Sequence, residues 1–202
     1  MTIELENICV TENGREILRD LTLDLSTEGA YLVTGEPGSG KTTLLRVIMG
    51  LRRPDRGRIR LLGDYKYAWL ACGAVFQEDR LIEALSAVRN VSVIRKLTSD
   101  KAAREELSGL LPAERLEIPV RELTASERRM VCIVRALSVP ADILVMDEPF
   151  AGMSENERTR ALRYITEHRG STPLVVAASD TAGMEGFRRV ELSAAEAPGQ
   201  DR

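Results

Sequence analysis

The sequence has 202 residues, of which 44% are hydrophobic and 29% are charged, a composition typical of one soluble globular domain. Its 28 Lys and Arg residues are balanced by 31 Asp and Glu residues, which excludes a protein that mainly coats nucleic acid, so we expect no nucleic-acid partner. The first residues do not resemble a signal peptide and the three cysteines are isolated, so we expect a chain that works in a reducing cytoplasm.

Alternating apolar and polar residues over the first sixty positions predict half-exposed antiparallel strands. The pair Asn13-Gly14 lies between two of these stretches and predicts a tight hairpin turn. Residues 31–33 are apolar on both faces and predict a buried strand, and the helix expected over residues 42–49 ends at Gly50. The strands predicted in this half of the chain cover residues 3–5, 21–25, 31–33 and 58–62.

From about residue 78 to residue 122 the spacing of apolar residues is typical of helices, and one helix is expected over residues 101–110. A second helix is expected to begin near Thr124 and to carry an apolar stripe made of Met130, Ile133, Val134 and Leu137. Trp69 lies in an apolar stretch, so we expect its ring in the core.

Two further buried strands are predicted over residues 143–146 and 174–178, which are apolar on both faces. Between them, Ser154 and Glu157 have the spacing of a capping box that opens a helix. Strands that alternate with helices indicate an α/β fold. We expect a mostly parallel core sheet covered on both faces, an antiparallel N-terminal β subdomain and a small helical insertion.

A phosphate-binding motif, G-x-x-x-x-G-K-[ST], follows the strand predicted at residues 31–33. Glycines are needed there because several backbone N–H groups must turn inward around a polyphosphate. Lys41 is expected to reach the β- and γ-phosphates, and the Thr42 hydroxyl to bind Mg²⁺. The predicted nucleotide-binding residues are Gly35, Glu36, Pro37, Gly38, Ser39, Gly40, Lys41, Thr42 and Thr43.

Two adjacent carboxylates follow the strand predicted at residues 143–146. Ligand sites of parallel sheets lie at the carboxyl ends of the strands, so we expect Asp147 and Glu148 to face the loop around Lys41. Asp147 is the candidate ligand of Mg²⁺, and Glu148 is the candidate general base that polarises the attacking water. The alternative is a pair of solvated acids without a chemical role.

With two further segments, these motifs make the chain resemble the ATP-binding subunit of an ABC transporter. Residues 75–82 look like the family's Q-loop, and residues 123–127 stand in place of its signature. The resemblance extends from Leu5 to about Leu192 and is greatest to importers of the nitrate, sulfonate and taurine type. It implies the ABC-type P-loop NTPase fold, with ATP and Mg²⁺ as cofactors and ATP hydrolysis as the activity.

The resemblance also implies a domain layout and partners. A single ABC ATPase domain would cover residues 1–192, with a core made of residues 1–77 and 138–192, a helical subdomain over residues 78–137, and a flexible tail over residues 193–202. Two such domains would form a head-to-tail dimer, either a homodimer or a heterodimer with another ABC subunit. The dimer would lie on the cytoplasmic face of the cell membrane against a permease subunit.

Roles for further site residues come from the same resemblance. Gln77 would contact Mg²⁺ and water and report the nucleotide to the permease through residues 78–91. Ser179 takes the position of the family's switch histidine. The signature residues that would contact ATP across the dimer are Thr124, Ala125, Ser126 and Glu127.

The signature departs from the family pattern in its charge and shape. Ala125 and Ser126 replace two glycines, and their Cβ atoms would obstruct a close approach to the γ-phosphate. Glu127 replaces a glutamine and adds a negative charge near a polyanion, unless its side chain rotates away.

Three other positions depart from the family as well. Ser179 cannot carry the positive charge of a histidine, and Ser154 replaces the aspartate of the D-loop. No aromatic residue between Ile8 and Glu16 is available to stack on adenine. Three functions therefore stay open: an ATPase that powers import, a nucleotide-binding subunit with little hydrolysis, and a soluble ABC-type ATPase outside transport.

Overall fold

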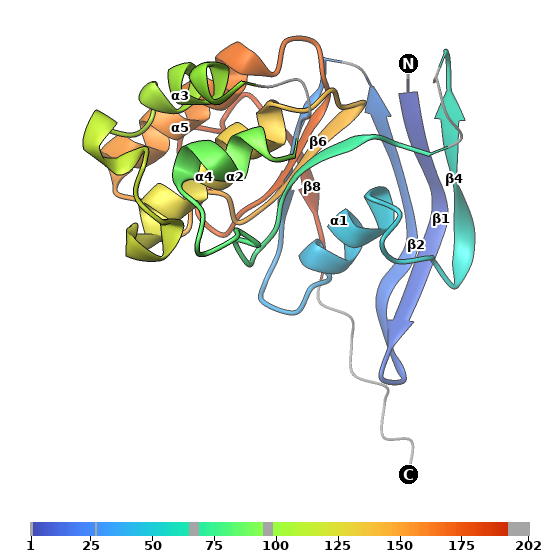
Figure 1. Cartoon of the computed structure of the whole chain (residues 1–202). Coiled ribbons are helices and arrows are strands. Elements are labelled where there is room, and N and C mark those ends of the chain that lie inside the picture. The colour runs from blue at the N-terminus through green and yellow to red at the C-terminus, as the bar shows by residue number, and fades with distance from the viewer. Residues whose placement is uncertain (1, 27, 65–68, 95–98, 194–202) are drawn as a thin grey trace. The chain divides into compact units, whose positions relative to one another are not determined.

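The computed structural model describes residues 2–26, 28–64, 69–94 and 99–193 (Figure 1). The chain divides into two compact units, each described here by itself. Met1–Leu70 and Ser171–Arg202 form the first unit, and Ala71–Gly170 form the second. The chain thus leaves the first unit and returns to it after the second. The layout of core and helical subdomain that the resemblance implies stays a prediction.

The first unit contains an antiparallel sheet, as the alternating sequence predicts. Strand β1 (Thr2–Glu12) lies between β2 (Arg15–Ser26) and β4 (Arg56–Leu62). Asn13 and Gly14 both have positive φ, which is the geometry of a type I′ hairpin turn. The buried face of this sheet includes Ile3, Leu5, Leu18 and Leu25.

The first unit also contains parallel strands and one helix. Strand β3 (Ala30–Thr34) pairs in parallel with β7 (Leu174–Ala177) and with β8 (Arg188–Glu191). Helix α1 (Lys41–Ile48) follows β3, and the positive φ of Gly50 just after the helix confirms the predicted stop. Strand β8 is absent from the sequence prediction because it is mostly charged and exposed.

The second unit is built on a parallel pair of strands, β5 (Cys72–Val75) and β6 (Ile143–Asp147). Every residue of β6 is buried, as its apolar sequence predicts. The short β5, which contains a glycine, is missing from the sequence prediction. Trp69 belongs to the first unit, and the expectation that it lies in the core is wrong, because 66% of its surface is exposed. Parallel pairing in both units, beside the antiparallel sheet, confirms the α/β fold class.

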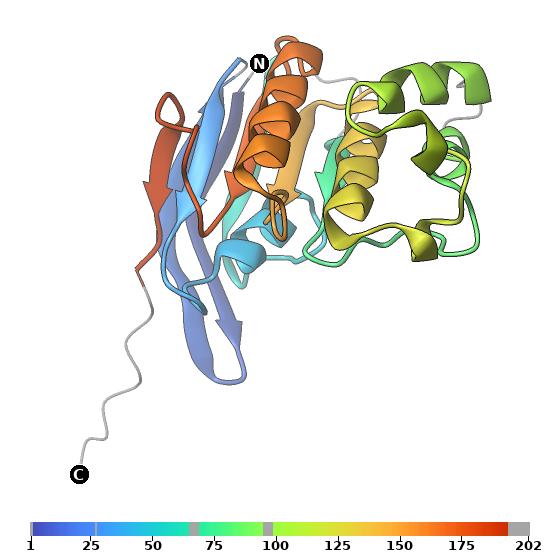
Figure 2. The ribbon, with the colours of Figure 1, turned by 90° about the vertical axis from the view of Figure 1, so that its left-hand side faces the viewer.

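The remaining elements of the second unit are helical. Helices α2, α3 and α4 gather in one cluster (Figure 2), which buries the predicted stripe residues Met130, Ile133 and Val134. The helical elements are α2 (Ala87–Ser92), α3 (Asp100–Ser108), η1 (Ala113–Arg115), η2 (Val120–Glu122), α4 (Ala125–Leu137) and α5 (Glu155–His168).

Within the described ranges, none of these helices combines the length and the apolar character needed to cross a membrane. The predicted flexible tail begins at Ser193, and residues 194–202 lie outside the described residues.

Candidate nucleotide site and its supporting residues

The loop between β3 and α1 has the tight backbone that a phosphate cage requires. Gly40 has a φ of +96°, and a Cβ atom there would lie 2.9 Å from side-chain atoms of Ile17 and Leu18. Gly35 has a φ of +147°, and a Cβ atom there would lie 2.4 Å from the carbonyl oxygen of Leu192. Only glycine fits these two positions without a shift of the surroundings.

Lys41 begins α1, and its ammonium group lies over the loop. The Nζ atom donates hydrogen bonds to the carbonyl oxygens of Gly35, at 2.6 Å, and Glu36, at 3.0 Å. The Ser39 hydroxyl is buried without a hydrogen-bond partner, and the first turn of α1 contains no acidic residue. A cation, a positive helix end and an unsatisfied hydroxyl together fit a bound polyphosphate. Thr42 and Thr43 follow in the same first turn of α1.

The structure brings Ser179 to the same edge of the first unit's parallel strands as this loop. In the register of β3 and β7, Val33 is opposite Ala177, and Ser179 follows two residues later. The carboxyl ends of parallel strands point the same way, so Ser179 and the loop after β3 leave the sheet at one end. Close to the loop, the Thr43 hydroxyl donates a 3.2 Å hydrogen bond to Glu12 of the β1–β2 hairpin.

The two predicted acids lie at the carboxyl end of β6 in the second unit. Asp147, the last residue of the strand, is buried. Glu148, the next residue, has a φ of +46°, a conformation that residues other than glycine seldom adopt. Backbone strain of this kind costs about 1–3 kcal/mol and persists mainly at functional sites. The strained backbone at Glu148 therefore favours a functional role for these acids over the alternative of two solvated acids without a chemical role.

Gln77 joins these acids at one end of the β5–β6 pair. Val75, the last residue of β5, is opposite Met146 of β6, so both strands end at the same level. Gln77, two residues after β5, and Asp147, the last residue of β6, therefore lie at the same edge of this parallel pair. That the acids and Lys41, which belong to different units, act on one nucleotide stays a prediction.

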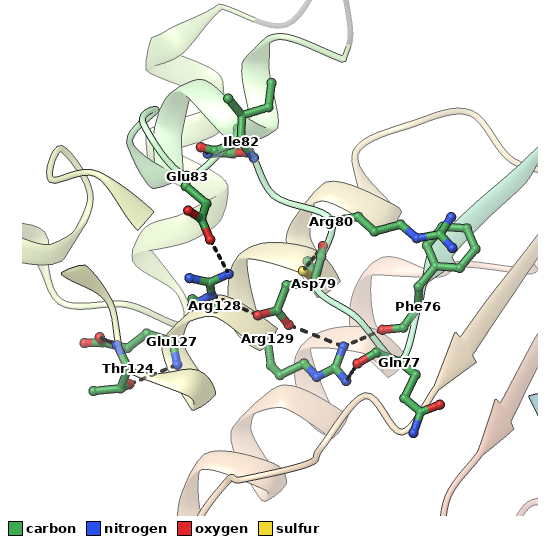
Figure 3. Close-up of polar contacts among 12 residues, drawn as sticks. Phe76, Gln77, Asp79, Arg80, Ile82, Glu83, Thr124, Glu127, Arg128 and Arg129 are labelled. Carbon is green, nitrogen blue, oxygen red and sulfur yellow. Dashed lines mark hydrogen bonds and ion pairs between the residues drawn. The ribbon is translucent and has the colours of Figure 1, made fainter. Parts of the chain in front are cut away.

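A buried arginine of α4 holds the backbone at Gln77. The guanidinium of Arg129 donates hydrogen bonds to the carbonyl oxygens of Phe76 and Gln77, and lies 3.5 Å from a carboxylate oxygen of Asp79 (Figure 3). Its side chain is only 6% exposed. A buried guanidinium needs such partners, so this contact fixes the segment after β5 against α4.

Other α4 side chains reinforce the same attachment. Arg128 donates a 2.9 Å hydrogen bond to the carboxylate of Asp79 (Figure 3). Arg135 donates to the carbonyl oxygens of Asp79, at 3.0 Å, and Arg80, at 2.8 Å. The buried thiol of Cys132 also points at the Asp79 carbonyl, at 3.1 Å. The segment at residues 76–80 and helix α4 thus form one connected block.

The start of α4 carries the signature residues, and it is closed by a capping box. The Glu127 N–H donates to the Thr124 hydroxyl at 3.2 Å, while the Glu127 carboxylate accepts from the Thr124 N–H at 2.8 Å. The same carboxylate accepts two 2.8 Å hydrogen bonds from Arg115. The hydrogen bond from Arg115 is the main reason that the pKa of Glu127 is lowered. The Glu127 carboxylate therefore points into the helix cap, and the positive charge of Arg115 compensates its negative charge.

Ser126 connects the signature to the following helix, α5. Its hydroxyl donates a 2.9 Å hydrogen bond to Glu157, and Glu157 also accepts from the Ser154 N–H at 2.8 Å. Ser154 is the N-cap of α5, which confirms the capping box predicted for Ser154 and Glu157. The serine that replaces the D-loop aspartate thus keeps a capping side chain there.

Two supporting residues, Arg115 and Arg129, were not anticipated from the sequence, and neither was the hydrogen bond from Ser126 to Glu157. Arg129 offers a weak signal, because a charged residue beside the apolar stripe of a helix must find a buried partner. The pairing of Arg115 with Glu127 carries no such signal, because the two residues belong to separate elements.

Comparison with known proteins identifies one family. The model of the family described as ABC transporter matches residues 18–151. A taurine import ATP-binding protein of Pseudomonas aeruginosa is 34% identical over 79% of this chain and 64% of its own length. A sulfate/thiosulfate import ATP-binding protein of Agrobacterium fabrum is 33% identical over 87% of this chain and 56% of its own length. The chain thus spans under two thirds of the length of these relatives.

Solved structures with the same fold are also ABC cassettes. A dimeric ATP-binding cassette in a post-hydrolysis state, bound to ADP and Pi, gives a TM-score of 0.81 at 20% identity and covers 95% of this chain and 96% of its own. The structure of an ABC transporter-type ATP-binding protein of Pyrococcus furiosus also gives a TM-score of 0.81 at 20% identity and covers 95% of this chain and 98% of its own.

Proposed function

Because this chain belongs to the ABC transporter family as one of its ATP-binding cassettes, we propose that it hydrolyses ATP in a head-to-tail dimer and so energises solute import through a separate permease. The cassettes of this family are ATPases that bind ATP. The observation that carries the proposal is the loop at residues 35–42, which has backbone positions that only glycine fits and which accepts hydrogen bonds from the ammonium group of Lys41.

Lys41 and the start of α1 bind the triphosphate in this proposal. The ammonium group exchanges its carbonyl partners in the loop for the β- and γ-phosphate oxygens, and the unsatisfied Ser39 hydroxyl gains an acceptor. Thr42 and Asp147 would hold Mg²⁺, which would supply positive charge to the phosphates when it is bound. Ser179 contributes a hydroxyl in place of a histidine near the γ-phosphate.

Glu148 orients the attacking water and accepts its proton. A strained backbone supports this role, because a carboxylate held in one direction from the end of β6 places its water reproducibly. Gln77, at the neighbouring strand end, would contact the metal and the attacking water. Its backbone is bonded to α4, so we propose that the nucleotide state is transmitted to α4 through Arg129.

The signature at the start of α4 contacts the nucleotide of the second subunit. The conflict that the sequence raises at Glu127 is reduced, because the carboxylate is occupied by the Thr124 cap and by Arg115. Ala125 and Ser126 still carry Cβ atoms where the family has glycine, so we expect a weakened transition-state contact and a lower rate.

A permease partner is supported by apolar side chains after Gln77. Ile82, Val93 and Ile94 are exposed in the second unit, within or next to the segment that the resemblance assigns to permease contact. Single exposed apolar residues are common, but three in one segment favour a docking surface. We propose that the assembly lies on the cytoplasmic face of the membrane, as a homodimer or with a second ABC subunit.

ATP turnover by the purified chain together with its co-purified membrane partner tests the proposal. We expect Glu148→Gln to stop turnover while leaving Mg-ATP binding intact, and Lys41→Ala to abolish binding. Glu155→Gln, an exposed glutamate at the start of α5, is the matched control and should retain full turnover. Turnover in the unmodified chain no higher than in Glu148→Gln would refute hydrolysis.

A subunit with little hydrolysis is the second candidate. It is favoured by the Ser126 hydroxyl, which is engaged by Glu157, and by the serine at position 179. A large rise in turnover on Ser179→His would favour this candidate, because the missing imidazole would then limit the rate. No observation within the described residues favours the third candidate, a soluble ABC-type ATPase outside transport.

A further inference from the structure

Arg115 and Glu127 form a two-pronged ion pair at the start of α4. Arg115 Nε and a terminal nitrogen each donate a 2.8 Å hydrogen bond to a different oxygen of the Glu127 carboxylate. The same terminal nitrogen also donates to the Glu122 carbonyl oxygen at 2.9 Å. Parallel hydrogen bonds between guanidinium and carboxylate fix direction as well as charge, so Arg115 determines where the Glu127 side chain points.

The neighbouring cations of α4 are engaged elsewhere. Arg128 is paired with Asp79 at 2.9 Å, and Arg129 with Asp79 and the backbone at Gln77. Within the described part of the chain, Arg115 is therefore the cation that compensates Glu127 directly. Without it, a carboxylate would stand uncompensated in the first turn of the helix whose leading residues are proposed to meet an anionic nucleotide.

We propose that Arg115 is a positioning residue that neutralises Glu127 and docks it on the Thr124 cap, so that the signature of this chain accepts the triphosphate of a second copy. The inference rests on the proposed ATP-dependent dimer. Arg115, which lies outside the signature, compensates the negative charge of Glu127, which lies inside it. The signature of this chain then consists of Thr124, Ala125, Ser126 and the Arg115–Glu127 pair.

The test is a charge cycle in Glu148→Gln protein, whose blocked hydrolysis preserves the ATP-bound state. Dimer formation with Mg-ATP is measured by analytical ultracentrifugation, and Mg-ATP binding by the monomer is measured by calorimetry. Arg115→Gln should weaken dimerisation at least about tenfold, which corresponds to about 1.4 kcal/mol, and leave monomer binding unchanged. Glu127→Gln added to Arg115→Gln should restore dimerisation to within about twofold.

Two further variants separate charge compensation from a merely structural role. Arg104→Gln removes the arginine of another ion pair of the second unit, with Glu117, and should leave dimerisation unchanged. Arg115→Lys keeps the charge and should lose less affinity than Arg115→Gln. Damage to the fold at Arg115 would not be repaired by removing the charge of Glu127.

The outcomes distinguish this inference from the proposed function. If the parent protein binds Mg-ATP and dimerises, but Arg115→Gln dimerises equally well or the double variant is not rescued, the inference fails and the proposed function stands. A parent protein that binds Mg-ATP and stays monomeric overturns the inference that the signature accepts the triphosphate of a second copy of this chain. A parent that binds no Mg-ATP overturns both.

Discussion

Replacing Arg129 with methionine tests whether α4 holds the segment at residues 76–79 in place. Methionine keeps an apolar stem of similar shape and removes the guanidinium. The lost contacts are two hydrogen bonds to the carbonyls of Phe76 and Gln77 and the ion pair with Asp79. The side chain is 6% exposed, so water cannot replace these contacts without local opening.

The expected cost follows from these contacts. A hydrogen bond that involves a charged group contributes about 1.5–3 kcal/mol. Asp79 is partly exposed and its ion pair with Arg129 is long, so this pair contributes little free energy. The two hydrogen bonds to carbonyl oxygens, each at about 1.5 kcal/mol, together contribute about 3 kcal/mol. For a chain of this size, that lowers the melting temperature by about 6–12 °C.

Arg128→Met is the matched control, because Arg128 is the adjacent residue and shares Asp79 as its partner. Its side chain is 23% exposed, and an accessible ion pair of this kind contributes less than about 1 kcal/mol. Calorimetric unfolding of both variants makes the comparison. Equal losses, or a larger loss for Arg128→Met, would refute the argument that burial at Arg129 makes the difference.

Three other substitutions test separate parts of the structure. Gly35→Ala should weaken Mg-ATP binding in a calorimetric titration and destabilise the fold by more than about 1 kcal/mol, because the new Cβ would collide with the Leu192 carbonyl; unchanged binding would contradict the cage. Thr124→Ala should cost about 1 kcal/mol in urea unfolding by removing the α4 cap, and no loss would argue against the capping box. Burial raises the pKa of the Cys72 thiol from its ordinary value of 9.0 to about 11. The contribution of the buried neutral thiol to the free energy of unfolding is therefore complete below pH 9.0 and is lost as the pH rises toward 11. Unfolding free energies between pH 8 and 11 should therefore fall less in Cys72→Ala, and parallel curves would contradict this assignment.

Local sequence patterns predicted most of the fold. The buried strand predicted at residues 143–146, the helix start near Thr124 and the capped start of α5 follow from residues adjacent in the chain. Strand β8 did not, because its charged sequence becomes a strand only by pairing with β3. Trp69 was misplaced because an apolar neighbourhood in sequence does not establish burial in space.

Motif positions could be predicted because phosphate binding requires contiguous residues, as in the loop at residues 35–42. The matching family model and the taurine import relative confirm the resemblance drawn from these motifs. The supporting contacts could not be predicted, because they join distant residues. Arg115 is 12 positions from Glu127, Ser126 is 31 from Glu157, and Arg129 is 53 from Phe76.

The proposed hydrolysis requires that Lys41 and the acids at residues 147 and 148 act on one nucleotide. A crystal structure of the Glu148→Gln protein with Mg-ATP tests it most directly. We predict the γ-phosphate within hydrogen-bond distance of Lys41 Nζ, and the metal ligated by Thr42 while contacting Asp147. A nucleotide bound away from the Lys41 loop, or held there with Asp147 and residue 148 remote from its phosphates, would contradict the account.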